Sequence, residues 1–232
     1  MLFRSAVLLG NRSAVENFIA LGADVNSAED DGTTLLMRAV HGKFPDIAKK
    51  LIDAGASVSA RNRYGVTALY LAARGGDATA TRRLLAAGLD ANTALPGGET
   101  ALMTAARSGH TDVVGALLAG SNPVASLADL ASNGDSTAGY SATDSGGYGS
   151  AARRPSKRNR ADVNTREQRY GDTALMWAAA AGQVGVVRLL IEAGADVRAV
   201  DDEGVSALDL ARTNGHAEVV AALIAAGANT GA

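Results

Sequence analysis

The sequence predicts an all-α fold of stacked, repeated helix pairs, and three observations lead to this prediction. A short pattern, Gly-x-Thr/Ser-x-Leu, recurs along the 232 residues, beginning at Gly32, Gly65, Gly98, Gly171 and Gly204. The spacings are 65 − 32 = 33, 98 − 65 = 33, 171 − 98 = 73 and 204 − 171 = 33. Small and apolar residues keep the same register within each unit. A fixed period of this length is typical of a solenoid made of repeated supersecondary units.

Each unit reads as a turn followed by two helices. The Thr or Ser of the pattern is a helix N-cap residue, because its hydroxyl can accept a hydrogen bond from an exposed backbone N–H. A glycine seven residues past the leucine ends the first helix, and Lys43 takes its place in one unit. An apolar quartet then lies on one face of a second helix, as in Val113, Val114, Leu117 and Leu118. One unit cannot bury this face alone, so stacking is required.

This unit resembles the ankyrin repeat, whose 33 residues form a turn and two helices. The resemblance implies an ankyrin-repeat solenoid of about six repeats: residues 1–119 hold a first repeat without its turn and three full repeats, and residues 161–232 hold two more. The alanine-rich repeats look more like bacterial ankyrin arrays than animal ones. The family's usual His after the Leu is replaced here by Met37, Tyr70, Met103, Met176 and Asp209. We expect apolar contacts of the methionines in place of the polar contacts of that histidine.

Residues 120–160 interrupt the register. The long spacing requires 73 − 33 = 40 extra residues, about 39 of them here and one in the turn before Gly171. The stretch 133–149 is rich in Gly, Ser, Ala and Thr, and a basic run follows at Arg153, Arg154, Lys157, Arg158 and Arg160. A disordered loop is the favoured interpretation. A degraded repeat, with Leu127, Leu130, Ala131 and Gly134 in a first helix, is the alternative, and a short helix at Val124–Ala131 fits both.

Composition and motifs favour no catalytic or cofactor chemistry. The chain has no cysteine, which excludes disulfides, cysteine metal sites and thiol catalysis. The histidines His41, His110 and His216 lie at separate repeat positions and form no ligand cluster. No apolar run reaches the roughly 18 residues of a membrane span. We therefore predict a non-enzymatic protein without cofactor or metal. The cytoplasm is the favoured location, with periplasm or secretion open if an upstream signal has been removed.

Binding to another protein is the predicted function. The resemblance implies contact through the turn tips and the exposed side of the first helices, where the candidate residues are Asp31, Arg63, Tyr64, Arg74, Arg107, Arg169, Tyr170 and Glu203. Arg and Tyr are frequent interface hot spots. Trp177 is expected to pack between repeats. Residues 61–120 carry six basic and four acidic side chains, net +2, which favours a partner that is acidic there.

Two other functions stay open at this point. The basic run that ends at Arg160 could bind nucleic acid or an anionic surface, although the net charge of −2 makes nucleic acid the weaker expectation. The chain could also be the ankyrin portion of a larger enzyme or signalling protein. The identity of the partner does not follow from the residues.

Overall fold

A computed structural model describes residues 2–120 and 159–228, and within these ranges the chain forms twelve helices and no β-strand. The all-α prediction is confirmed. The first helix of each repeat is α1 (Leu2–Leu8), α3 (Leu35–His41), α5 (Ala68–Gly75), α7 (Ala101–Arg107), α10 (Ala174–Ala180) or α12 (Ala207–Thr213). The second helix is α2 (Arg12–Ala20), α4 (Pro45–Asp53), α6 (Ala78–Ala86), α8 (Thr111–Ala119), α11 (Val184–Glu192) or α13 (Ala217–Ala225).

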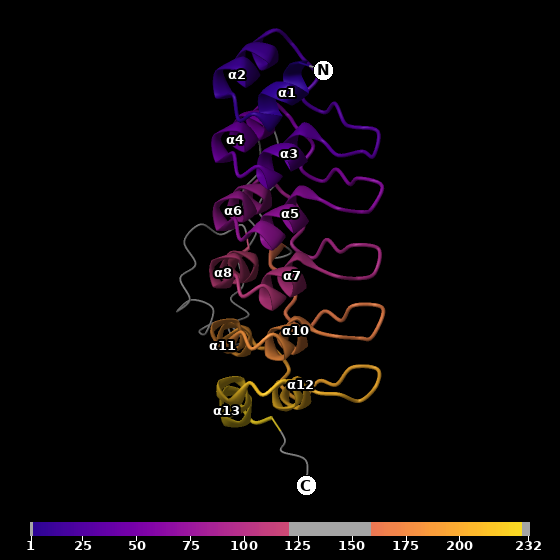
Figure 1. The fold of residues 1–232 in the computed structure, drawn as a ribbon, viewed down its shortest axis with the longest axis vertical. Helices are drawn as coiled ribbons and strands as arrows, with labels where there is room; N and C mark the ends of the chain where they lie inside the picture. Colours follow the sequence, from indigo (N-terminus) through magenta and orange to yellow (C-terminus); the bar gives the residue numbers. More distant parts are fainter. Residues whose placement is uncertain (1, 121–158, 229–232) are drawn as a thin grey trace, which may run out of the picture.

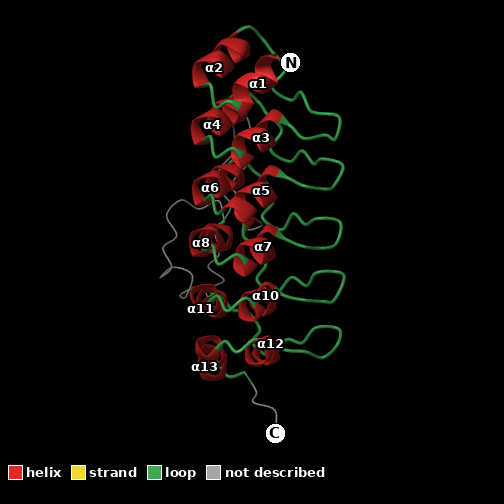
Figure 2. Ribbon diagram, viewed as in Figure 1, coloured by secondary structure: helices red, strands yellow, loops and turns green. Residues whose placement is uncertain are grey.

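The helices form two parallel layers, one of first helices and one of second helices (Figure 1). Five turns project from the layer of first helices to the same side of the molecule, where Figure 2 shows them as green loops. Each first helix packs on the first helix of the next repeat and on the second helix of its own repeat. None of the helices in the described part of the chain combines the length and hydropathy of a membrane span.

The predicted N-caps are present at the start of the first helices. Thr34, Thr67, Thr100, Thr173 and Ser206 each accept a hydrogen bond from the backbone N–H three residues later, at 3.2–3.3 Å. The methionine expectation is met, since Met37, Met103 and Met176 are each 1% exposed. Two of them also accept weak hydrogen bonds, Met103 Sδ from the Thr100 N–H and Met176 Sδ from the Thr173 N–H.

Small residues allow the first helices to pack closely, and leucines fill the space between the layers. The repeated alanine of the first helix is buried in five successive repeats, at Ala39, Ala72, Ala105, Ala178 and Ala211. Leucines of the second helices are equally buried, as at Leu51, Leu84, Leu117, Leu190 and Leu223. Each buried leucine side chain contributes about 1.5–3 kcal/mol to the free energy of folding, relative to an exposed one. The core is therefore a continuous strip that grows by one layer per repeat.

The stack is continuous across the insertion. Helix α7 packs directly against α10, and α8 packs against α11. The returning chain is fixed at the point of departure, because the Ala161 N–H donates to the Leu117 carbonyl at 3.0 Å and the Arg160 Nε donates to the Leu118 carbonyl at 2.7 Å. The three expectations for the insertion, a disordered loop, a degraded repeat and a short helix at Val124–Ala131, concern residues outside the described ranges.

Candidate functional site

The tips of the five turns form a regular row along one side of the stack (Figure 1). In each repeat the tip consists of the two residues before the glycine that begins the repeated Gly-x-Thr/Ser-x-Leu pattern. These are Asp30 and Asp31, Arg63 and Tyr64, Pro96 and Gly97, Arg169 and Tyr170, and Asp202 and Glu203. We call these ten residues the tip row. The row is acidic at both ends, and its two Arg-Tyr pairs lie on either side of Pro-Gly.

The Arg-Tyr pairs are exposed and internally ordered. The Arg63 guanidinium carbon lies 5.3 Å from the centroid of the Tyr64 ring, and the Arg169 carbon lies 4.9 Å from the centroid of Tyr170. Tyr64 is 60% exposed and Tyr170 is 45% exposed. A cation over an aromatic face is attracted by the ring quadrupole, so each pair presents a pre-arranged surface. Exposed tyrosines held in this way suit protein contacts.

Backbone hydrogen bonds join most neighbouring turns and keep the tip row rigid. The Arg63 N–H donates to the Asp31 carbonyl at 2.8 Å, and the Asp202 N–H donates to the Tyr170 carbonyl at 2.8 Å. The Gln168 N–H similarly donates to the Gly97 carbonyl at 2.9 Å. Tip residues can therefore act together on a partner that spans several turns.

Glu167 holds the turn that carries Arg169 and Tyr170. Its carboxylate is buried and accepts from the N–H groups of Arg169 at 2.7 Å, of Asp172 at 3.4 Å and of Tyr170. Burial raises the pKa of Glu167, but the backbone N–H donors together lower that pKa by more. Sequence reasoning missed this residue. The sequence did hold a signal, because the repeat spacing predicts one extra residue in this turn. The structure contains it: the residues paired by an isolated β-bridge across this turn, Arg166 and Thr173, are 173 − 166 = 7 positions apart, whereas Ala28 and Thr34 of the first turn are 34 − 28 = 6 positions apart.

The two acidic candidates differ in their surroundings. Asp31 is half-buried and its Oδ1 accepts from the Thr33 N–H at 2.8 Å, a bond that lowers the pKa of Asp31 and shapes its own turn. Glu203 is exposed, and its N–H donates to Asp201 Oδ1 at 2.9 Å. Asp31 therefore has a clear structural role, whereas Glu203 is an exposed residue at the end of the tip row.

A second group of candidates lies on the first helices. His41, Arg74 and Arg107 occupy the same position, five residues after the repeat leucine, and we call them the basic stripe. All three are exposed. The Arg107 Nη2 atom lies 3.7 Å from the Glu99 Oε1 atom, and the Arg107 guanidinium carbon lies 4.6 Å from the centroid of the Trp177 ring. The stripe thus places basic side chains on three successive repeats beside the turns.

Trp177 is half-buried and packs against the core, as expected, while its ring also supports Arg107. Its indole Nε1 donates to Asp172 Oδ2 at 3.2 Å. Burial raises the pKa of Asp172, and the hydrogen bond from Trp177 opposes that rise in pKa without cancelling it. The result is a polar and aromatic cluster where α7 meets α10.

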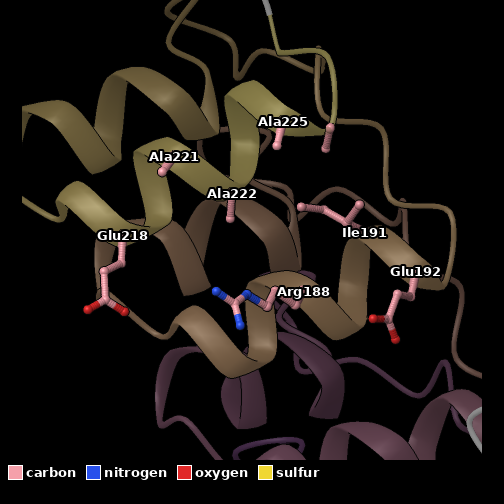
Figure 3. A pocket seen from close by; sticks show the side chains of 8 residues that line it. Arg188, Ile191, Glu192, Glu218, Ala221, Ala222 and Ala225 are labelled. Carbon is pink, nitrogen blue, oxygen red and sulfur yellow. The ribbon is translucent and has the colours of Figure 1, made fainter.

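The second-helix layer carries a different surface. A groove of about 530 Å³ between α11 and α13 is lined by four alanines of the last repeat together with Ile191, Arg188, Glu192 and Glu218 (Figure 3). In Figure 3 the Arg188 side chain lies between the two glutamates. Within residues 2–120 and 159–228, no three His, Asp or Glu side chains form a group that could hold a metal ion.

The basic run predicted for the insertion is only partly described. Arg160 donates through Nε to the carbonyl of Leu118 at 2.7 Å, near the C-terminal end of α8. A cation at this end interacts favourably with the helix dipole, so Arg160 has a structural role. The other four members of the run lie outside the described residues.

Comparison with known proteins agrees with the geometry. A family model for ankyrin repeats in three copies matches residues 3–94, 36–127 and 139–232. The chain belongs to the ankyrin-repeat family. Ankyrin repeats are a general protein–protein interaction module, and proteins of this fold generally use it for binding and not for catalysis.

Solved ankyrin structures superpose on nearly the whole chain. The ankyrin repeat domain of Bcl-3, a member of the IkappaB protein family, has a TM-score of 0.75 and 26% identity over 99% of this chain and 87% of that one. An ankyrin repeat domain from Acinetobacter baumannii AYE has a TM-score of 0.74 and 25% identity over 98% of each chain. Human palmitoyltransferase ZDHHC17 is 50% identical over 50 residues, which are 22% of this chain and 8% of that protein.

Proposed function

We propose that this ankyrin-repeat chain binds a partner protein across its front face, which comprises the tip row and the basic stripe. The observation that carries the proposal is the pair of exposed Arg-Tyr stacks in a row of turns that backbone hydrogen bonds join at three of its four junctions, with a bond from the Arg61 side chain to the Ala94 carbonyl at the fourth. Tyrosine and arginine side chains that are already stacked on one another lose less conformational entropy on binding than free side chains would. The partner therefore has to span at least three turns, from Tyr64 to Tyr170.

The charges of the front face favour a partner that is acidic at the middle of the array. The repeats that carry Arg63, Arg74 and Arg107 have a net charge of +2, whereas residues 161–232 have five basic and ten acidic side chains, net −5. Arg74 has no carboxylate within 4.0 Å among the described residues, so it is free to pair with a partner. Complementary charge of this kind sets orientation and association rate more than affinity.

Affinity capture tests this proposal with two matched variants of the full chain. The front variant carries Tyr64→Ala, Arg74→Ala and Tyr170→Ala. The control carries Arg188→Ala, Glu192→Ala and Glu218→Ala on the second-helix layer. Quantitative mass spectrometry should show a partner that is retained by the wild type and the control and depleted at least about tenfold by the front variant. Equal recovery by all three proteins would contradict the assignment, and circular dichroism at 222 nm checks that each is folded.

The other two interpretations remain predictions with their own tests. Binding of nucleic acid or an anionic surface through the basic run predicts an affinity that falls when residues 120–160 are deleted and when salt is raised. The interpretation as the ankyrin portion of a larger enzyme or signalling protein predicts an adjacent domain in the full reading frame. Both leave the front face free for a protein partner.

A further inference from the structure

A small pocket lies between the C-terminal ends of α3 and α5, next to the basic stripe. Its volume is about 240 Å³, and it is lined by Val40, His41, Lys43, Leu71, Arg74, Gly75 and Asp77. Val40 is buried and Leu71 is half-buried, so they form an apolar wall. Three of the other side chains are basic. The pocket therefore combines a short apolar surface with a cluster of hydrogen-bond donors.

The basic groups of the pocket lack carboxylate partners. Neither Lys43 nor Arg74 has an ion pair within 4.0 Å among the described residues, although eight other ion pairs occur there. Asp77 is the acidic residue of the lining, but its Oδ1 accepts from the Ala80 N–H at 2.8 Å and caps α6. The cationic charge of the pocket is thus available to a ligand.

Lys43 departs from the repeat at a cost in stability. Its φ is +56°, the only positive φ of a non-glycine residue in the described part of the chain. The same repeat position is glycine elsewhere, at Gly10, Gly76, Gly109, Gly182 and Gly215, each with positive φ. A side chain retained in this strained conformation points to a role for the side chain itself. The lysine extends over α5, with Cε 3.8 Å from the Cβ position that a side chain at Gly75 would have.

The pocket exists because a second residue also departs from the repeat. At four other junctions, the glycine equivalent to Lys43 is covered by a side chain of the next repeat. Phe44 lies over Gly10, His110 over Gly76, Gln183 over Gly109 and His216 over Gly182. The equivalent residue above Lys43 is Asp77, which is shorter and turns towards the N-terminus of α6. The space that a ring or amide fills elsewhere is left open at this one junction.

We propose that this pocket binds the carboxylate of a glutamate side chain in an acidic segment of the partner, an inference that rests on the proposed function. Lys43, Arg74 and His41 donate to the carboxylate, and Val40 and Leu71 contact its methylene stem. The carbonyl ends of α3 and α5 oppose negative charge, so a singly charged carboxylate fits better than a doubly charged phosphate. The segment continues along the basic stripe towards Arg107.

The test is a titration of the full chain with a fluorescein-labelled hexaglutamate peptide, followed by fluorescence anisotropy. Lys43→Gly and Arg74→Gln should each weaken the affinity about threefold, and the double variant about tenfold, as expected for exposed charge pairs. Arg188→Gln removes one positive charge from the second-helix layer and should leave the affinity unchanged. Hexaglutamine should not bind, and a hexapeptide of alternating phosphoserine and alanine should bind more weakly than hexaglutamate.

Stability separates a loss of binding from a loss of folding. Lys43→Gly replaces a strained residue by the one that other repeats use, so its urea midpoint should equal or exceed that of the wild type. Binding that is equal in Lys43→Gly, Arg74→Gln and Arg188→Gln would overturn the pocket, as would absence of hexaglutamate binding or tighter binding of the phosphopeptide. Depletion of a captured partner by the Tyr64, Arg74 and Tyr170 variant would still support the front face in those cases.

Discussion

Substitution of Gly98 by alanine tests whether the turns support one another. Gly98 has a φ of +85°, and an added Cβ would lie 2.7 Å from the Gln168 backbone nitrogen and 3.2 Å from the Glu167 Cα. The contacted atoms belong to the next turn, which is itself fixed by the hydrogen bond from the Gln168 N–H to the Gly97 carbonyl. Gly204 is the matched control, because its φ is +81° and no atom lies within 4 Å of the added Cβ.

The two substitutions share the conformational cost and differ in the steric cost. Alanine in the left-handed region costs about 1–2 kcal/mol, partly offset by about 0.5–1 kcal/mol from the reduced entropy of the unfolded chain. Gly204→Ala should therefore destabilise by about 1 kcal/mol. Gly98→Ala adds about 1–3 kcal/mol for overpacking against backbone that cannot rotate away, which gives about 2–4 kcal/mol in total.

Urea denaturation followed by circular dichroism at 222 nm measures both free energies of unfolding. Emission of Trp177, the single tryptophan of the chain, provides a second probe beside the disturbed turn. Each kcal/mol should lower the Tm by roughly 2–4 °C for a chain of this length. Equal destabilisation by the two substitutions would refute the argument, because it would mean that the turn at residues 166–173 moves aside without cost.

Three further predictions concern a cap and two carboxylates. Thr100→Ala removes the N-cap of α7 and should lower the free energy of unfolding by about 1 kcal/mol in urea denaturation. The Arg38 guanidinium lowers the pKa of Glu29. The ion pair between them therefore stabilises the folded state fully above about pH 4.3, and this stabilisation is lost as pH falls through the lowered pKa of Glu29. Urea midpoints of the wild type and Arg38→Gln should therefore differ at pH 7 and converge at pH 2. Burial raises the pKa of Asp172 above its value in the unfolded chain. The folded state therefore loses stability as pH rises from about 3.9 through the raised pKa of Asp172. Asp172→Asn keeps an oxygen for Trp177 and should have a higher urea midpoint than the wild type at pH 7 but not at pH 3.

The repeat spacing predicted the array because it depends on local chemistry that each unit reproduces. A threonine such as Thr100 caps its helix by bonding a backbone group three residues away, and the regular alanines and leucines follow from helix periodicity. The candidate positions were likewise set by register. The repeat pattern places Arg63 and Tyr64 at the tip of a projecting turn. Their exposure could therefore be predicted without knowledge of their neighbours.

The missed features depend on contacts between repeats or on the backbone path of a single longer turn. The support of Arg107 by the Trp177 ring joins residues on either side of the insertion, and it exists because α10 packs directly on α7. The role of Glu167 needs a turn one residue longer, whose backbone folds around the carboxylate. Lys43 was visible as an exception in the sequence, but the pocket also requires the Asp77 carboxylate to turn towards α6.

In a repeat fold, the departures from the repeat are the natural candidates for partner recognition, because the common residues rebuild the scaffold in every unit. Lys43 and Asp77 depart at one junction: Lys43 adds a positive charge there, and the short Asp77 side chain leaves open the space that a larger side chain fills at other junctions. The Arg-Tyr pairs depart at two tips separated by one turn. These features lie on the face formed by the turns and first helices. Their shared side follows from the repeat register, but the basic and aromatic residue types at these positions do not, and the proposed acidic partner that crosses several repeats would account for those types.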